Sequence, residues 1–267
     1  MTAQQQHVFE MYLTVISVIA GGLVGSFLNV CIYRVPLSLS VVTPGSRCDR
    51  CGVPVRWYDN IPLISFLVLQ GRCRFCGVYF GSRHFWIEGL TALCAGAVFS
   101  RYGISFESLY YFVFACVLIV VTFIDMDHKI IPDGISYWGL AIGLLLSIHF
   151  QIAQMRWAVS LYESLLGIAL GGGLLWAVAW VYEKITLREG LGLGDVKLMA
   201  FFGAHVGVKG VCFTLFYGSL LGSIVGLTLM ALGGAHRKTA IPFGPYLCAG
   251  LILYFLRLHT LFPTMFE

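Results

Sequence analysis

Charged residues are scarce in this chain, and their scarcity excludes an ordinary soluble protein. They make up 11% of the 267 residues, whereas a soluble domain carries roughly 25%. The basic residues follow the loops and form no dense patch, so nothing in the sequence indicates nucleic-acid binding. Long internal repeats and low-complexity tracts are absent as well. The hydrophobic share of 58% therefore predicts a protein that crosses a membrane several times.

Apolar segments recur along the whole chain, and the first is long enough to cross a bilayer, which takes roughly 20 residues. The sixth is short and is predicted to be a half-helix or a tilted span. We therefore expect an all-α polytopic membrane protein with about eight transmembrane helices. The segments lie at about 8–32, 85–100, 106–124, 134–150, 160–182, 196–206, 209–232 and 240–257.

Three domains follow from this pattern. Residues 1–33 are the expected first transmembrane helix, residues 34–83 a small cytoplasmic domain with four cysteines, and residues 84–267 a membrane-embedded core. With eight crossings and the N-terminus outside, only four of the 17 basic residues fall on the outer side: Arg101, Arg156, Lys209 and Arg257. The excess of positive charge marks the opposite side as cytoplasmic. The loops predicted to be cytoplasmic are 33–83, 125–133, 183–195 and 233–239.

Nine cysteines fall into two groups. Four of them form two Cys-x-x-Cys pairs, Cys48 with Cys51 and Cys73 with Cys76, and a glycine follows each pair. Four thiolates at this spacing can close a tetrahedral zinc site, which would stabilise a loop that is too small for its own core. A redox dithiol pair and disulfides are the alternatives, although a reducing cytoplasm argues against disulfides. The other five cysteines lie in apolar runs and are expected to be small buried hydrophobes: Cys31, Cys94, Cys116, Cys212 and Cys248.

Two acidic residues stand at the predicted cytoplasmic ends of apolar segments. Asp125 directly follows the apolar run 120–124, and Asp195 begins the sixth segment after Gly192-Leu193-Gly194. The topology predicts that both carboxylates lie at the same membrane depth. Two such acids can share a proton, so that one activates a water and the other protonates a carbonyl, as in aspartic proteases. Two separate interfacial acids are the alternative interpretation.

Three other charged residues have alternative interpretations. Asp133 precedes Gly134 and an apolar run, which is typical of a helix N-cap. Lys197 is predicted either to extend toward the membrane interface or to steer a substrate carboxylate. Glu88 follows Arg83 and His84 early in the second segment. It is either an interfacial ion-pair partner or part of a site, because acids are costly in apolar spans.

Several motifs together resemble those of the bacterial type IV prepilin peptidases, which are GxGD intramembrane aspartyl peptidases. The stretch 192–197 (GLGDVK) matches the GxGD signature, and 124–133 (IDMDHKIIPD) is similar to the first aspartate motif of the family. The N-terminal motif 25–30 (GSFLNV) and the cysteine loop with its DNIP at 59–62 are similar to the family as well. Asp49 and Phe85 stand where family members often have proline. Neither departure removes a candidate ligand or acid.

The resemblance implies a specific reaction and site. It implies cleavage of the basic leader from prepilins or pseudopilins after a glycine, at the cytoplasmic face of the bacterial inner membrane, with Asp125 and Asp195 as the catalytic pair. It also implies methylation of the new N-terminal amine with S-adenosylmethionine, because the four-cysteine domain is associated with members that perform both reactions. The implied partners are prepilins or pseudopilins and the lipid bilayer. A peptidase that does not methylate and a zinc-stapled membrane scaffold are the alternatives.

Finer expectations concern the glycines, the cofactor and the proton. Gly192 and Gly194 are predicted to shape the substrate site by letting the backbone turn tightly and approach a ligand closely. No glycine-rich Rossmann fingerprint indicates where S-adenosylmethionine binds. Asp195 would start a helix, where the dipole favours a charged carboxylate, and Asp125 would end one, where the dipole favours the protonated form. We therefore expect Asp195 to carry the charge and Asp125 the shared proton.

Overall fold

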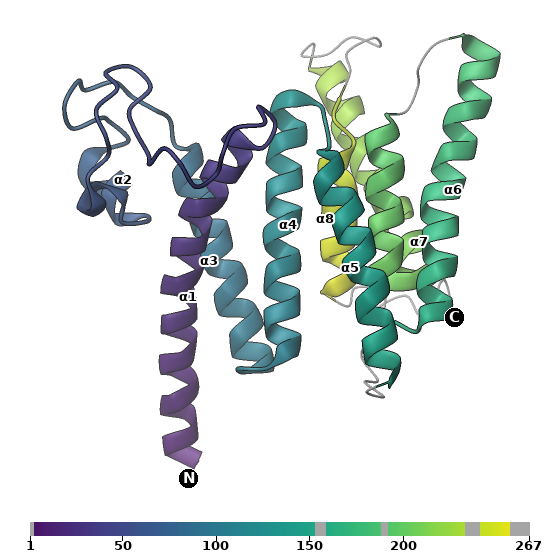
Figure 1. The fold of residues 1–267 in the computed structure, drawn as a ribbon, viewed down its shortest axis with the longest axis horizontal. Helices are drawn as coiled ribbons and strands as arrows, with labels where there is room; N and C mark the ends of the chain where they lie inside the picture. The colour runs from purple at the N-terminus through teal and green to yellow at the C-terminus, as the bar shows by residue number, and fades with distance from the viewer. Residues whose placement is uncertain (1–2, 153–158, 188–191, 233–240, 257–267) are drawn as a thin grey trace. The chain divides into compact units, whose positions relative to one another are not determined.

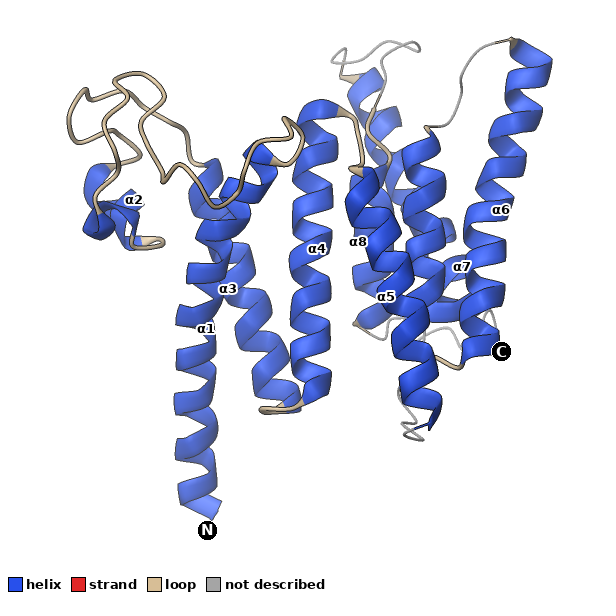
Figure 2. Ribbon diagram, viewed as in Figure 1, coloured by secondary structure: helices blue, strands red, loops and turns tan. Residues whose placement is uncertain are grey.

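The computed structural model describes residues 3–152, 159–187, 192–232 and 241–256 (Figure 1). Within these ranges the chain forms α-helices, one short 3-10 helix and loops, and Figure 2 shows no strand among them. The all-α fold predicted from the sequence is therefore confirmed. Some of the basic residues on which the predicted orientation depends lie outside the described residues: Arg156, Arg188, Arg237, Lys238 and Arg257.

Each predicted apolar segment corresponds to helix, and the sixth and seventh segments fall within a single element, α7. Three elements belong to the region between the first two apolar segments or border it: the 3-10 helix η1, the short helix α2 and the start of α3. The elements are α1 (Ala3–Arg34), η1 (Trp57–Asn60), α2 (Ile64–Leu69), α3 (Arg83–Tyr102), α4 (Phe106–His128), α5 (Asp133–Ile152), α6 (Leu161–Thr186), α7 (Leu193–Ala231) and α8 (Gly244–Phe255).

Four helical stretches of the described chain are long and apolar enough to cross a membrane. They are Gln4–Arg34, Phe106–His128, Leu161–Thr186 and Leu193–Ala231, and α8 is a shorter apolar helix. A chain with several such helices is a membrane protein, because a bilayer-spanning helix requires about 20 mostly apolar residues. The count of eight crossings stays a prediction.

The chain divides into two compact units, Met1–Val120 and Val121–Glu267, with the boundary inside α4. In the first unit α1 packs against α3. Glycines on α1 permit this close approach: a Cβ on Gly21 would lie 2.6 Å from the Cβ of Ala95, and one on Gly25 would lie 2.8 Å from the Cα of Glu88. Small residues four apart are typical of tightly packed membrane helices. The packing brings the motif 25–30 beside the beginning of α3.

In the second unit, α7 packs against α5, α6 and α8. A Cβ on Gly203 of α7 would lie 2.2 Å from the carbonyl oxygen of Gly167 on α6, so these two backbones touch. Around this contact lie fully buried side chains of α7, among them Leu198, Met199 and Phe201. The first half of α7 is therefore held firmly among its neighbours.

Gly207 interrupts α7 with a φ of 64° and a ψ of −167°, which are not helical values. Positive φ favours glycine. The break divides α7 into a shorter helix before Gly207 and a longer helix after it. Its position agrees with the predicted boundary between the apolar segments 196–206 and 209–232. In Figure 1 both ends of α7 lie at the upper end of the second unit, so the two halves run in opposite directions.

Candidate functional site

Asp125 lies in the last turn of α4 and is buried, with 5% of its surface exposed. Its Oδ2 accepts a hydrogen bond of 2.9 Å from the backbone N–H of Gly244. Gly244 is the first residue of α8 and precedes Pro245, a residue that is common in the first turn of a helix. The carboxylate of Asp125 is therefore held by the N-terminus of another helix.

The end of α4 bends the chain back toward this carboxylate. Lys129 has a φ of 54°, and its N–H donates to the carbonyl oxygen of Asp125 over 2.9 Å. A left-handed residue with such a bond is a common helix terminator. The chain then continues to Ile131, which is buried, before Pro132 and the start of α5.

Asp195 lies in the first turn of α7 and is half-buried. Its N–H donates to the carbonyl oxygen of Gly192 over 3.1 Å, and Gly192 is the N-cap residue. The carboxylate is therefore close to the positive end of a helix dipole, as its predicted position at a helix start requires. It is not itself the cap.

The structure brings Asp125 and Asp195 together within the second unit. Gly194, which precedes Asp195, and Gly244, which binds Asp125, both lie against Ile131: a Cβ on Gly194 would lie 3.2 Å from the Cβ of Ile131, and one on Gly244 would lie 3.4 Å from its Cδ1. The charge of Asp125 also acts electrostatically on Asp195. Two carboxyl groups in this arrangement can share a proton. A catalytic role for this pair stays a prediction.

The predicted reason for the two glycines is wrong in part. Gly192 has a φ of −67° and a ψ of 137°, which any residue adopts, and Gly194 is not among the residues with positive φ. Neither glycine is needed for a tight turn. Gly194 instead lies close to Ile131, where an added Cβ would be only 3.2 Å from the Ile131 Cβ. A role of Gly192 and Gly194 in shaping the substrate site stays a prediction.

Lys197 and Asp133 form an ion pair with 2.7 Å between Nζ and Oδ1. The Nζ of Lys197 also lies 5.3 Å from the ring centre of Tyr137. Asp133 is the first residue of α5, so the predicted N-cap is wrong. This ion pair links the start of α5 to the first turn of α7, which carries Asp195. Lys197 therefore binds another helix, whereas the sequence predicted that it would extend to the membrane interface or steer a substrate carboxylate.

Sequence reasoning did not identify Gly244, although it is a direct partner of Asp125. The sequence Phe243-Gly244-Pro245 indicates a helix start. No local pattern shows that the backbone N–H of Gly244 donates to an acid 119 residues away.

On the activity that the sequence resemblance implies, replacing Gly244 by alanine is expected to reduce leader cleavage by about a hundredfold, because small displacements of a reacting group have effects of this size. The added Cβ would lie 2.7 Å from Oδ2 of Asp125, closer than such atoms can approach, and would push the carboxylate aside. A prepilin cleavage assay in detergent measures the rate. Gly173→Ala on α6 is the matched control, because nothing lies within 4 Å of its added Cβ. Equal rates for the two variants would contradict this assignment.

In the first unit, the four cysteines of the two pairs converge. Their sulfur atoms all lie within 4.8 Å of one another, with 3.7 Å between Cys48 and Cys76 and 4.0 Å between Cys51 and Cys73. Four sulfurs bound at about 2.3 Å to a central zinc ion would lie about 3.8 Å apart. The cluster can therefore hold a metal ion, and its geometry fits tetrahedral coordination.

Each cysteine pair is held in a tight turn. The N–H of Gly52 donates to the carbonyl oxygen of Cys48 over 2.8 Å, and Gly77 makes the same contact with Cys73 over 2.9 Å. Both glycines have positive φ, so each pair needs the glycine that follows it. The backbone N–H groups of Cys51 and Arg50 lower the pKa of the Cys48 thiol to about 7, while burial and the neighbouring thiols raise the pKa of Cys51 to about 11, so without a metal the cluster does not hold all four thiols ionised. A thiolate is the form that binds metal.

Among the other cysteines, the expectation of burial is confirmed for Cys116 and Cys248. It is wrong for Cys212, which is exposed on α7, while Cys31 and Cys94 are half-buried. An exposed cysteine in an apolar helix fits a surface that faces lipid, where a thiol behaves as a small apolar group.

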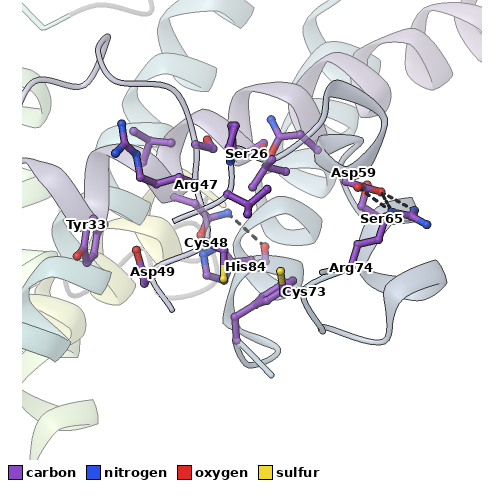
Figure 3. Close-up of a pocket in the computed structure, with 18 of the residues that line it drawn as sticks. Ser26, Tyr33, Arg47, Cys48, Asp49, Asp59, Ser65, Cys73, Arg74 and His84 are labelled. Carbon is purple, nitrogen blue, oxygen red and sulfur yellow. Dashed lines mark hydrogen bonds and ion pairs between the residues drawn. The ribbon is translucent and has the colours of Figure 1, made fainter. Parts of the chain in front are cut away.

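A cluster of polar side chains joins α1 to α3 next to the cysteine loop. Glu88 is buried, and its Oε2 accepts a hydrogen bond of 2.8 Å from the N–H of Leu63. The Ser26 side chain lies near the same carboxyl group. Asn29 donates to the carbonyl oxygen of His84 over 3.4 Å. Figure 3 shows Ser26 and His84 together with Cys48 and Cys73 around one pocket. Glu88 is therefore not the interfacial ion-pair partner that its sequence position suggested.

Two family models match the chain. The model described as the bacterial peptidase A24 N-terminal domain matches residues 19–102. The model of the type IV leader peptidase family matches residues 112–227. The second match contains both Asp125 and Asp195, and the first contains the four cysteines and Glu88.

Curated relatives resemble nearly the whole chain. A prepilin leader peptidase/N-methyltransferase of Pseudomonas aeruginosa is 34% identical over 254 residues, which cover 86% of each chain. Proteins with the same name from Pseudomonas putida and Xanthomonas campestris are 34% and 32% identical, each with 88% of both chains covered. No solved structure matches the chain significantly. The matches to full-length relatives and to both family models show that the chain belongs to the type IV leader peptidase family.

Proposed function

We propose that the chain cleaves the basic leader from type IV prepilins or pseudopilins after a glycine, and methylates the new N-terminal amine. The relatives named prepilin leader peptidase/N-methyltransferase are similar to this chain over most of its length. The observation that carries the proposal is that Asp125, at the end of α4, lies close enough to Asp195, at the start of α7, for its charge to act on it. This arrangement supports an aspartic peptidase in a membrane protein.

Cleavage needs a base and an acid at one place. One carboxylate takes a proton from a water, whose oxygen attacks the carbonyl carbon of the scissile bond, while the partner carboxyl gives its proton to the carbonyl oxygen. The carbon–nitrogen bond then breaks, and the leaving amine takes up a proton from the pair. Gly244 supports this chemistry, because its N–H fixes one oxygen of Asp125 and stabilises negative charge on it.

We propose zinc as the metal of Cys48, Cys51, Cys73 and Cys76, with a structural role. All four ligands come from the protein, and a closed set of four thiolates is typical of structural zinc. The metal would hold residues 34–83 as the separate cytoplasmic domain that the sequence predicts. We propose S-adenosylmethionine as the methyl donor, because the name of the relatives includes N-methyltransferase.

The proposed location is the bacterial inner membrane, with the acids at the cytoplasmic face. A prepilin lies in the bilayer with its basic leader in the cytoplasm, so the cut requires acids at that depth. The abundance of arginine in residues 34–83 supports a cytoplasmic position for this loop. The proposed partners are therefore pilins of type IV pili or pseudopilins of type II secretion, within the lipid bilayer.

One experiment tests both reactions. The purified chain in detergent is incubated with a prepilin and S-adenosylmethionine, and the products are weighed by mass spectrometry. We expect loss of the leader mass together with the gain of one methyl group. Loss of the leader alone would indicate a peptidase that does not methylate. An unchanged substrate would favour a zinc-stapled scaffold and would contradict the proposal.

A further inference from the structure

The first unit contains a cavity of about 860 Å³ between the cysteine loop and the ends of α1 and α3 (Figure 3). Ligand sites commonly have volumes of about 300–1,000 Å³, so this space is large enough for a nucleoside with an attached amino acid. Its walls come from α1, η1, α2, both cysteine pairs and the first turns of α3. The aspartate pair lies in the other unit and does not contribute to it.

Glu88 gives this cavity a buried carboxyl group. Only 9% of Glu88 is exposed, and its hydrogen-bond partner is the N–H of Leu63. No lysine or arginine within the described chain forms an ion pair with it. Buried carboxylates are normally paired with a cation, because an isolated buried charge is costly. A cationic ligand in the cavity would supply the charge that the described chain does not place beside Glu88.

Positive charge lines another part of the same cavity. Five arginines and three acids lie in its walls. Asp59 forms an ion pair with Arg74, with 2.6 Å between the closest atoms, as the dashed lines in Figure 3 show. Arg47, by contrast, forms no ion pair in the part of the chain that the structure describes, and Figure 3 shows it on the opposite side of the cavity from Arg74. The cavity therefore offers an anion and a cation to one ligand.

Aromatic rings complete the lining. Phe66, Tyr79 and Phe80 border the cavity together with Tyr33. Such rings provide flat apolar faces for a nucleobase and attract cations to their faces. A ligand that satisfies the acid, the guanidinium and the rings carries a positive charge, a carboxylate and a planar base.

We propose that this cavity binds the methyl donor, with the Glu88 carboxylate against its positive charge and Arg47 near its carboxylate. The inference rests on the proposed function, which requires a donor that is a sulfonium, an amino acid and an adenine nucleoside at once. The newly formed N-terminus of a cleaved pilin is also a cation. It offers no matching carboxylate and no nucleobase, and fits the lining less well.

Binding of S-adenosylmethionine to the full-length protein in detergent tests this site without depending on turnover. Isothermal titration calorimetry is expected to show that Glu88→Gln weakens binding at least tenfold relative to the unchanged chain. Glutamine has the same shape and can still accept from Leu63, but it lacks the charge. The matched control is Glu10→Gln, an exposed acid on α1 that does not line the cavity. It is expected to bind with unchanged affinity.

A second measurement covers the possibility that Glu88→Gln fails to fold. The unchanged chain is irradiated with S-adenosylmethionine that carries a radioactive methyl group, and the labelled peptides are mapped. Attachment within residues 26–88 is expected, and attachment within 121–267 would overturn the assignment. Equal affinity of the folded Glu88→Gln variant and the unchanged chain would also overturn it. If the unchanged chain binds no donor in either experiment, the methylation half of the proposed function fails together with this inference.

Discussion

Asp125→Asn and Asp195→Asn are each expected to reduce leader cleavage by about a thousandfold or more, within the range that general acid–base catalysis contributes. Asparagine keeps the shape of aspartate, and at position 125 it can still accept from the N–H of Gly244. It cannot take a proton from water or deliver one to the substrate. The rate of leader removal from a purified prepilin, followed by mass spectrometry, measures the effect.

Folding and specificity need their own controls in this experiment. Asp127→Asn removes an exposed acid two residues from Asp125 and is expected to leave the rate unchanged. The double variant Asp125→Asn/Asp195→Asn is expected to be no slower than either single variant, because groups that act as a unit have non-additive effects. Unaltered thermal unfolding would show that each variant is folded. Full cleavage by either single variant would exclude the aspartate pair.

Removal of one cysteine of the cluster is expected to release the metal and unfold the domain of residues 34–83. Cys76→Ser leaves three thiolates, and structural zinc supplies about 10–16 kcal/mol of apparent binding free energy in small zinc peptides. The chain with four cysteines should carry about one zinc ion per molecule by mass spectrometry of metals, and the variant much less. Limited proteolysis should then cut within residues 34–83 of the variant only.

Cys212→Ser is the matched control for this prediction. Its thiol is exposed on α7, far along the chain from the cluster, and belongs to the other unit. Zinc content and the protease pattern should not change in this variant. If Cys76→Ser keeps a full equivalent of zinc, the metal is not held by these four thiolates. If it loses the zinc but resists the protease, the metal is not what stabilises the domain.

Features that depend on a local sequence pattern could be predicted from the sequence alone. The two cysteine pairs with their glycines predicted a metal cluster, and the thiols do converge. The apolar flank of Asp125 and the glycines before Asp195 predicted two acids at helix ends, which the structure confirms. The division of the sixth and seventh segments was also visible, because Gly207 lies between two apolar runs.

Long-range contacts were not accessible in the same way. The ion pair of Lys197 joins residues 64 positions apart, and the periodicity of either helix says nothing about it. The dipole of α4 taken alone favours the protonated form of Asp125. The hydrogen bond from α8 favours negative charge at the same carboxylate, so helix position alone is not a sufficient basis for assigning the proton.

The bond between Gly244 and Asp125 also bears on how the enzyme is made. It joins residues 119 positions apart, and Asp195 is synthesised between them. A chain still emerging from the ribosome therefore contains both acids before it contains the backbone group that fixes one of them. On the proposed function, peptidase activity begins only after α8 has been translated and packed, so nascent chains in the membrane would not cut pilins while the rest of the protein is unfinished.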